Sequence, residues 1–433
     1  MRAFIIIWLS QFISANGSRM SGFAISIWAW EQTGQVTALT LIAFFSLLPG
    51  ILIAPIAGMM VDRYSRKQMM IVGDIAAILV TLMILLLYLT DNLQIWHLYV
   101  ASIIEGTFSQ FQELAYSASI TLLVSKQHYT RASSMEFLSL YGALMIAPPL
   151  AGSLYAIIGF PGIVLIDVVT FFLAILTVIC VHIPQPAVTQ SPQVQTATIF
   201  SQLQFGFRYV TARPGLLALL TAIAWFNLAL YLSDAIYYPM ILSRTENNAI
   251  VLGSLMAAAG VGGVIGASFM SIWGGSSRRI HGVLGGMIGV GLNKIIFGSG
   301  QTVWLWIPAQ VCASFCFPIF GGSEQPIWLS KVTPDLQGRV FATNQMVQKM
   351  SLAIAFLVAG PLADYVFEPA MQPAGHLAPI FGGFLGTGKG AGIALLYVLC
   401  AICMVLIGVG GYAFPALRNV EHSLPDHTAN LSP

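Results

Sequence analysis

The sequence contains few charged residues for its length. Asp, Glu, Lys and Arg make up only 8% of the 433 residues, whereas a soluble protein has about 25%. So few charges cannot cover the surface of a water-soluble protein of this size. The mean hydropathy of +0.82 holds for the whole chain, which indicates that hydrocarbon is the main solvent of the fold. This composition excludes a large soluble domain.

The sequence also lacks the residue patterns of catalysis and of metal or nucleotide binding. Its five cysteines lie in apolar segments without a neighbouring histidine, so Cys400 and Cys403 are interpreted as packing residues. The stretch 383–390 resembles a phosphate-binding loop, but it follows no predicted strand and has Gly390 where Ser or Thr should hold magnesium. A net charge of +2 without a basic run excludes a nucleic-acid partner. We therefore expect no enzyme activity, cofactor or metal.

What the sequence does contain is a series of apolar stretches, each long enough to cross a membrane. The first begins after Arg2 like a signal peptide, but its pattern continues to Trp30 and further spans follow, so we expect a retained helix. Six spans precede a polar break at 184–213 and six follow it. The predicted spans are 3–29, 37–57, 68–90, 97–124, 132–158, 162–183, 214–242, 249–273, 280–299, 301–330, 340–366 and 388–414.

The connections between these spans differ sharply in positive charge. With the N-terminus in the cytoplasm, the outer connections carry only Arg244 and Lys389. The cytoplasmic connections carry Arg63, Arg66, Lys67, Lys126, Arg131, Arg208, Arg213, Arg278, Arg279, Lys331, Arg339 and Arg418. Because Lys and Arg concentrate on the cytoplasmic side, we expect both termini in the cytoplasm of a bacterial inner-membrane protein.

The two halves of the chain resemble each other. The segment 147–152 of the fifth span (Ala-Pro-Pro-Leu-Ala-Gly) recurs as 359–364 (Ala-Gly-Pro-Leu-Ala-Asp) in the eleventh. Parallel halves of six spans, with a substrate site between them near the midplane, are a recurrent transporter architecture. We predict an N-terminal half at 1–183, a cytoplasmic linker at 184–213 with a short amphipathic helix at 199–213, a C-terminal half at 214–415 and a cytoplasmic tail at 416–433.

The connection between the second and third spans carries the most specific motif of the chain. Gly58 permits close helix approach, and Asp62 ends one helix where it can face the positive N-terminus of another. Arg63, Arg66 and Lys67 can form charge pairs that break when the protein changes state, although such cations can also serve only to fix topology. The pattern G-x-x-x-D-R-x-x-R-K resembles the signature of the major facilitator superfamily, which implies an all-α fold of twelve transmembrane helices in two pseudo-symmetric halves.

Further residues resemble the branch of that superfamily that exports macrolides and siderophores. They are Leu48-Pro49-Gly50 with Pro55, the Trp96–Tyr99 segment, and Gly360–Asp364 with Glu368-Pro369. The Ala147, Pro148, Pro149 and Gly152 element is similar to a motif of proton-coupled antiporters, with Ala147 where glycine is usual. The resemblance implies a secondary transporter that exports small amphipathic molecules, such as a drug, a macrolide or a siderophore or peptide metabolite, in exchange for protons. We expect the protein to be a monomer.

Several charged residues fall inside the predicted spans, where each costs roughly 2.5–3.5 kcal/mol and needs a partner or water. In the fold that the chain resembles, the first, fourth, seventh and tenth spans line the cavity. This selects as candidates for proton coupling and substrate contact Arg19, Glu105, Glu113, Asp234 and Glu324. We expect Glu113 to couple protons, and Glu105 is open to a structural role with Arg19. For Asp74, Asp167 and Asp364 we expect structural roles.

Two other functions remain open at this point. The same fold could serve as a facilitator or importer of a nutrient, or the protein could be a membrane receptor that transports nothing. Apart from the substrate and protons, the expected partner is membrane lipid.

Overall fold

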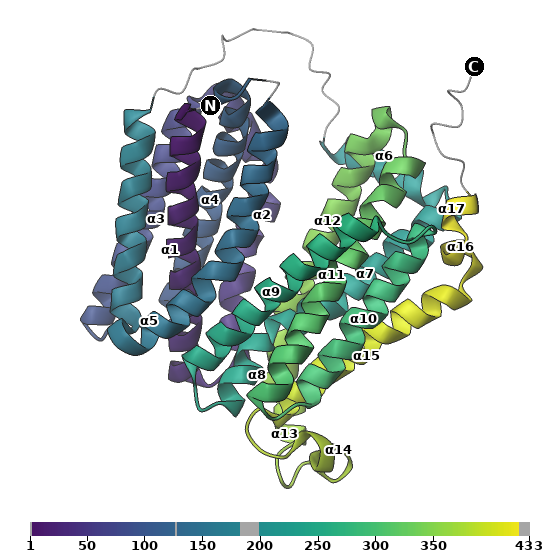
Figure 1. Cartoon of the computed structure of the whole chain (residues 1–433). Coiled ribbons are helices and arrows are strands. Elements are labelled where there is room, and N and C mark those ends of the chain that lie inside the picture. The colour runs from purple at the N-terminus through teal and green to yellow at the C-terminus, as the bar shows by residue number, and fades with distance from the viewer. Residues whose placement is uncertain (1, 126–127, 182–198, 424–433) are drawn as a thin grey trace, which may run out of the picture. The chain divides into compact units, whose positions relative to one another are not determined.

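The computed structural model describes residues 2–125, 128–181 and 199–423, which fold into helices joined by short connections (Figure 1). The first helices are α1 (Arg2–Thr33), α2 (Val36–Arg63), α3 (Arg66–Leu89), α4 (Ile95–Leu123) and α5 (Tyr129–Cys180). The first half of the predicted linker, residues 184–198, lies outside the described residues. The final part of the linker forms α6 (Ile199–Thr211), a helix that the sequence had predicted.

The second part of the chain is equally helical. Its elements are α7 (Pro214–Ala235), α8 (Tyr237–Arg244), α9 (Ala249–Trp273), α10 (Arg279–Ser299), α11 (Val303–Lys331), α12 (Pro334–Pro361), the π-helix η2 (Leu362–Phe367), α13 (Glu368–Ala370), α14 (Ala378–Leu385), α15 (Ala391–Ala413), α16 (Pro415–Arg418) and α17 (Val420–Ser423).

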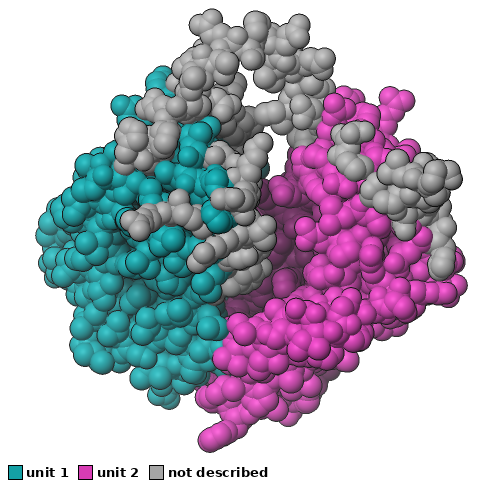
Figure 2. Space-filling model, turned by 45° about the horizontal axis from the view of Figure 1, so that its top comes forward, with its two compact units in different colours: residues 1–194, 245–257 teal, residues 195–244, 258–433 magenta. Residues whose placement is uncertain are grey.

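The chain divides into two compact units (Figure 2). Unit 1 comprises Met1–Val194 and Thr245–Ala257, and unit 2 comprises Gln195–Arg244 and Ala258–Pro433. The first part of α9 therefore packs with the N-terminal helices. The domain boundaries expected from the sequence stay a prediction.

The twelve spans expected from the sequence correspond to helices. Nine helical segments of the described residues are long and apolar enough to cross a membrane: Val36–Ile53, Arg66–Leu89, Gly142–Cys180, Pro214–Arg244, Ala249–Trp273, Arg279–Ser299, Val303–Lys331, Leu336–Ala370 and Ala391–Ala413. The helices α1 and α4 have 32 and 29 residues and are long enough but more polar. The twelfth span arises because α5 contains two.

The break inside α5 lies at Gly159. This residue has a φ of 65°, which glycine adopts at little cost and a β-branched residue avoids. The chain folds back here, and both arms of α5 pack against α1 (Figure 1). In the first arm, a Cβ at Gly142 would meet the ring of Phe12 at 3.2 Å, and in the second arm Asp167 lies against Gly17. The two predicted spans 132–158 and 162–183 thus form a helical hairpin around α1.

Unit 2 has a continuous apolar core built mainly from α7, α10 and α11, with fully buried side chains such as Leu216, Phe226 and Met287. The predicted tail begins by packing on this core through α16 and α17. The Glu421 carboxylate accepts the backbone N–H of Ile280 at 3.1 Å. A carboxylate at this position compensates the positive N-terminal end of α10.

The segment between Glu368 and Gly390, which contains α13 and α14, is anchored by two charged side chains. Arg244 donates to the carbonyl oxygens of Gly300 and Leu385, each at 2.9 Å. Glu368 accepts the N–H of Gly390 and, at 3.2 Å, that of Ile393. In both anchors the charged group binds backbone atoms, which satisfies helix ends that would otherwise lack partners.

Candidate functional site

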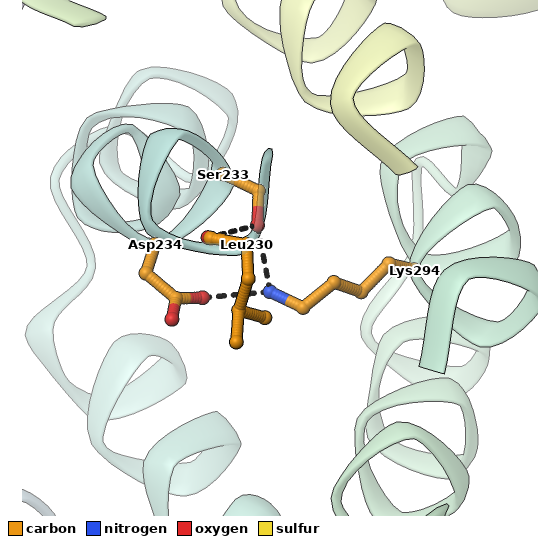
Figure 3. Close-up of polar contacts among 4 residues, drawn as sticks. All are labelled: Leu230, Ser233, Asp234 and Lys294. Atoms are coloured by element: carbon orange, nitrogen blue, oxygen red, sulfur yellow. Dashed lines mark hydrogen bonds and ion pairs between the residues drawn. The ribbon is translucent and has the colours of Figure 1, made fainter. Parts of the chain in front are cut away.

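A partly buried ion pair joins α7 and α10 in unit 2 (Figure 3). Lys294 of α10 extends toward the last turn of α7, where its Nζ lies 2.7 Å from Asp234 Oδ1 and donates to Ser233 Oγ at 2.9 Å. Ser233 in turn donates to the carbonyl oxygen of Leu230 at 2.7 Å. Consecutive residues at the end of α7 thus offer the ammonium group two oxygen acceptors.

The two members of this pair differ in exposure. The side chain of Lys294 is 9% exposed and that of Asp234 is 50% exposed. The ammonium group also lies 5.1 Å from the centre of the Tyr397 ring, within the range of a cation–π contact. The hydroxyl groups of Tyr237 and Tyr397 are buried without a hydrogen-bond partner among the described residues. The result is a polar cluster with a fixed cation, an accessible carboxylate and two unused hydroxyl groups.

Glu324, the other acidic candidate of unit 2, lies half-buried on α11. It accepts a hydrogen bond of 3.2 Å from Trp328 Nε1, one turn further along the same helix. Tyr231 of α7 lies within electrostatic range of both Glu324 and Asp234. Both acidic candidates of unit 2 therefore act on the same tyrosine.

The candidates of unit 1 lie on α1 and α4. Glu105 and Glu113 are exposed on α4, two turns or roughly 12 Å apart on one side of the helix. Arg19 is half-buried on α1, next to Ser18, whose hydroxyl donates to Asp167 Oδ1 at 3.2 Å. Glu105 lies within electrostatic range of this buried Asp167. The sequence had indicated only a structural role for Asp167.

The motif between α2 and α3 forms a tight connection, since α2 ends at Arg63 and α3 begins at Arg66. The surroundings of Gly58 and the side chains of Asp62 and Arg63 lie outside what the structure describes. The interpretation of Asp62 as part of a conformational switch therefore stays a prediction.

The other two cations of that motif bind backbone carbonyl groups. Arg66 Nη1 donates to the carbonyl oxygen of Ala118 on α4. Lys67 Nζ donates to the carbonyl oxygens of Ile179 at 2.7 Å and Val181 at 3.0 Å. Cations stabilise the negative C-terminal end of a helix, so Lys67 ties the start of α3 to the end of α5.

The element at Ala147, Pro148, Pro149 and Gly152 belongs to the first arm of α5 and faces the start of α9, within unit 1. A Cβ at Gly152 would collide with the carbonyl oxygen of Ala249, and a Cβ at Gly253 would come within 2.9 Å of the carbonyl oxygen of Pro148. Two glycines thus let the helix backbones touch, as small residues do in membrane helix pairs.

The loop that resembles a phosphate site leads into α15. The Glu368 carboxylate already accepts the N–H groups at the start of this helix, where a phosphate would bind. Beside it lies a pocket of about 220 Å³ lined by Arg244, Gln301, Leu385, Gly386, Thr387, Lys389 and Ala391. Among the described residues no group of His, Cys, Asp and Glu could hold a metal ion.

The sequence identified Asp234 as a candidate but did not identify Lys294 as its ion-pair partner. Lys294 stands alone in an apolar, glycine-rich helix, and such an isolated cation is itself a sign of an internal partner. What the sequence could not supply is which carboxylate lies at the same depth on a neighbouring helix.

Long apolar helices that enclose buried charges define a multi-pass membrane protein of the transporter class. Residues 7–356 match the model of the Major Facilitator Superfamily. The chain belongs to this superfamily, as the residues 58–67 had indicated, and it is a transporter.

Relatives and solved structures agree with this assignment. Macrolide efflux protein A of Streptococcus pyogenes is 25% identical over 368 residues, covering 84% of this chain and 90% of that protein. Enterobactin exporter EntS of Shigella boydii serotype 18 is 24% identical over 351 residues, covering 79% and 77%. A bacterial homologue of the human lysosomal transporter Spinster superimposes with a TM-score of 0.72 at 14% identity, covering 98% of both chains, which shows a shared fold.

Proposed function

We propose that this transporter exports small amphipathic molecules, of the macrolide or siderophore type, in exchange for protons. The observation that carries the proposal is the pair of relatives named for macrolide efflux and enterobactin export, each matched over more than three quarters of both chains. The absence of a nucleotide-binding motif from the sequence leaves an ion gradient as the energy source that fits.

The ion pair of Lys294 and Asp234 supports coupling to protons. Asp234 is half exposed and can meet water, whereas Lys294 is almost fully buried. Protonation of Asp234 would remove the negative charge that compensates the buried ammonium group. The cation would then need another acceptor, so a single proton changes the polar contacts between α7 and α10. A change of this kind can bias a transporter between two states.

We further propose that the protein acts as a monomer in the bacterial inner membrane with both termini in the cytoplasm. The distribution of Lys and Arg supports this orientation. A periplasm-active reporter fused after Leu424, just beyond the described residues, should give no signal. A strong signal would refute the orientation.

Export can be tested in everted membrane vesicles, in which the cytoplasmic face is outside. Vesicles that contain the protein should accumulate a radiolabelled macrolide when the interior is acidified by respiration, and an uncoupler should abolish this uptake. Asp234→Asn should abolish the proton-driven accumulation. Asp91→Asn makes the same chemical change in an exposed turn and is expected to leave it intact.

The alternatives give different results in the same experiment. A nutrient importer would concentrate its substrate in right-side-out vesicles and not in everted ones. A receptor would give no flux in either preparation. Either result with a panel of macrolides and catecholate siderophores would overturn the proposed function.

A further inference from the structure

Asp74 of α3 carries a carboxyl group that is buried inside unit 1. Only 3% of the residue is exposed. The neighbouring Gly73 allows α3 and α4 to approach closely, because a Cβ there would lie 2.6 Å from Cβ of Gln112. This close packing places a polar residue of α4 beside the carboxyl group and leaves no room for a larger side chain.

Two amide side chains accompany Asp74. Gln112 Nε2 donates to Oε1 of Gln11 on α1 at 2.8 Å, and both amides lie close enough to Asp74 to act as its hydrogen-bond partners. Yet Asp74 Oδ2 and Gln11 Nε2 are both buried without a hydrogen bond to any described residue. One carboxyl oxygen and one amide donor of the same cluster thus lack a hydrogen bond to any described residue. The cluster lies where α1, α3 and α4 meet.

No cation of the described residues forms an ion pair with Asp74. On its own helix, Arg66 and Lys67 bind carbonyl oxygens. The other titratable groups on this helix and on the helices around it are Arg2, Arg19 and Glu31 of α1, Asp62 and Arg63 of α2, Tyr88 of α3, His97, Tyr99, Glu105, Glu113 and Tyr116 of α4, and Tyr129, Arg131, Glu136, Tyr141, Tyr155, Asp167 and Cys180 of α5. Of these, Tyr116 donates to Glu136, Asp167 accepts from Ser18, and Glu105 and Glu113 are exposed.

Burying an ionised carboxylate without a cation is strongly unfavourable in such an interior, whereas burying a neutral carboxylic acid is no more unfavourable than burying another polar group. We propose that Asp74, with Gln11 and Gln112, forms a proton-binding site inside unit 1, and that Asp74 carries its proton in the packed state. The proton leaves the carboxyl oxygen for water when the contact between α3 and α4 loosens. This inference rests on the proposed proton coupling for its role in transport, but the site itself does not require it.

Infrared spectroscopy of the purified full-length protein in lipid tests the site without any transport assay. At neutral pH the wild type should show the carbonyl absorption of a protonated carboxyl group. Labelling all aspartates with ¹³C at the carboxyl carbon should shift it, and exchange into D₂O should shift it slightly. Asp74→Asn should remove the component of this absorption that belongs to Asp74, and Asp91→Asn, the same chemical change in an exposed turn, should leave the spectrum unchanged.

The absence of a ¹³C-sensitive protonated-carboxyl absorption from the wild type would overturn the proposal, even if the Asn variant cannot be purified. An unchanged absorption in Asp74→Asn would also overturn it. Loss of the absorption from the wild type on adding Na⁺ at constant pH would show a cation site instead. A role in coupling predicts at least a tenfold loss of proton-driven accumulation in Asp74→Asn, with macrolide binding kept. If the infrared result holds and the wild type transports no macrolide, the proton site stands and the proposed function fails.

Discussion

The ion pair between Asp234 and Lys294 predicts an asymmetric response to mutation. Asp234→Asn leaves the ammonium group of Lys294, whose side chain is only 9% exposed, without its counter-ion. Loss of one partner from a buried pair typically costs about 3–5 kcal/mol. Lys294→Met leaves the opposite charge behind, but that carboxylate is half exposed and can be hydrated. Since exposed pairs contribute at most about 1 kcal/mol, and Met fills a similar volume, the second variant should lose far less stability.

Thermal unfolding of the purified variants in detergent checks this asymmetry. We expect the unfolding temperature to fall most for Asp234→Asn and least for Lys294→Met. The double variant should lie close to Lys294→Met, because removing the stranded cation removes the penalty. Asp91→Asn, in an exposed turn, controls for the chemical change alone. Equal losses in the two single variants, or additive losses in the double variant, would refute the reasoning.

Three further predictions concern other sites. Gly152→Leu should abolish transport and lower the unfolding temperature, because the new side chain would meet the Ala249 carbonyl group. The control Gly263→Leu, at a position with open space, should be tolerated. Equal effects of the two variants would contradict the close packing of α5 on α9. Asp62→Asn should leave the protein in the membrane and remove most transport, and wild-type rates in proteoliposomes would reduce the motif to a topology signal. Glu113→Gln should abolish substrate-coupled proton flux in everted vesicles with substrate binding intact; unchanged flux would exclude Glu113 from coupling.

The fold was predictable from the sequence because apolar periodicity and the length of a span are local properties. All twelve spans coincide with helices, and the kink in α5 falls in the predicted gap between 158 and 162. The family was predictable because its motif is contiguous at 58–67 and is confirmed by the family match. The hydropathy pattern also located α6, although its neighbours at 182–198 lie outside the described residues.

The polar contacts were less accessible to sequence reasoning. The pairing of Asp234 with Lys294 depends on how far α7 and α10 are displaced along their axes, which no local pattern encodes. The burial of Asp74 depends on the tight approach of Gln112 to Gly73. The sequence showed that both acids lie in spans but not which of them had a cation within reach.

The anchors of the segment between Glu368 and Gly390 have a practical consequence. Arg244 and Glu368 recognise main-chain atoms, and Met371, Leu377, Phe381 and Leu385 pack in an apolar cluster, so the exposed side chains between the anchors are not needed to hold the segment in place. Exposed positions such as Ile380 and Phe384 of α14 can therefore be replaced, and an epitope can be grafted there as a rigid handle for antibody fragments. For a membrane protein of this size, an antibody fragment bound there would serve as the fiducial marker that particle alignment in electron cryomicroscopy requires.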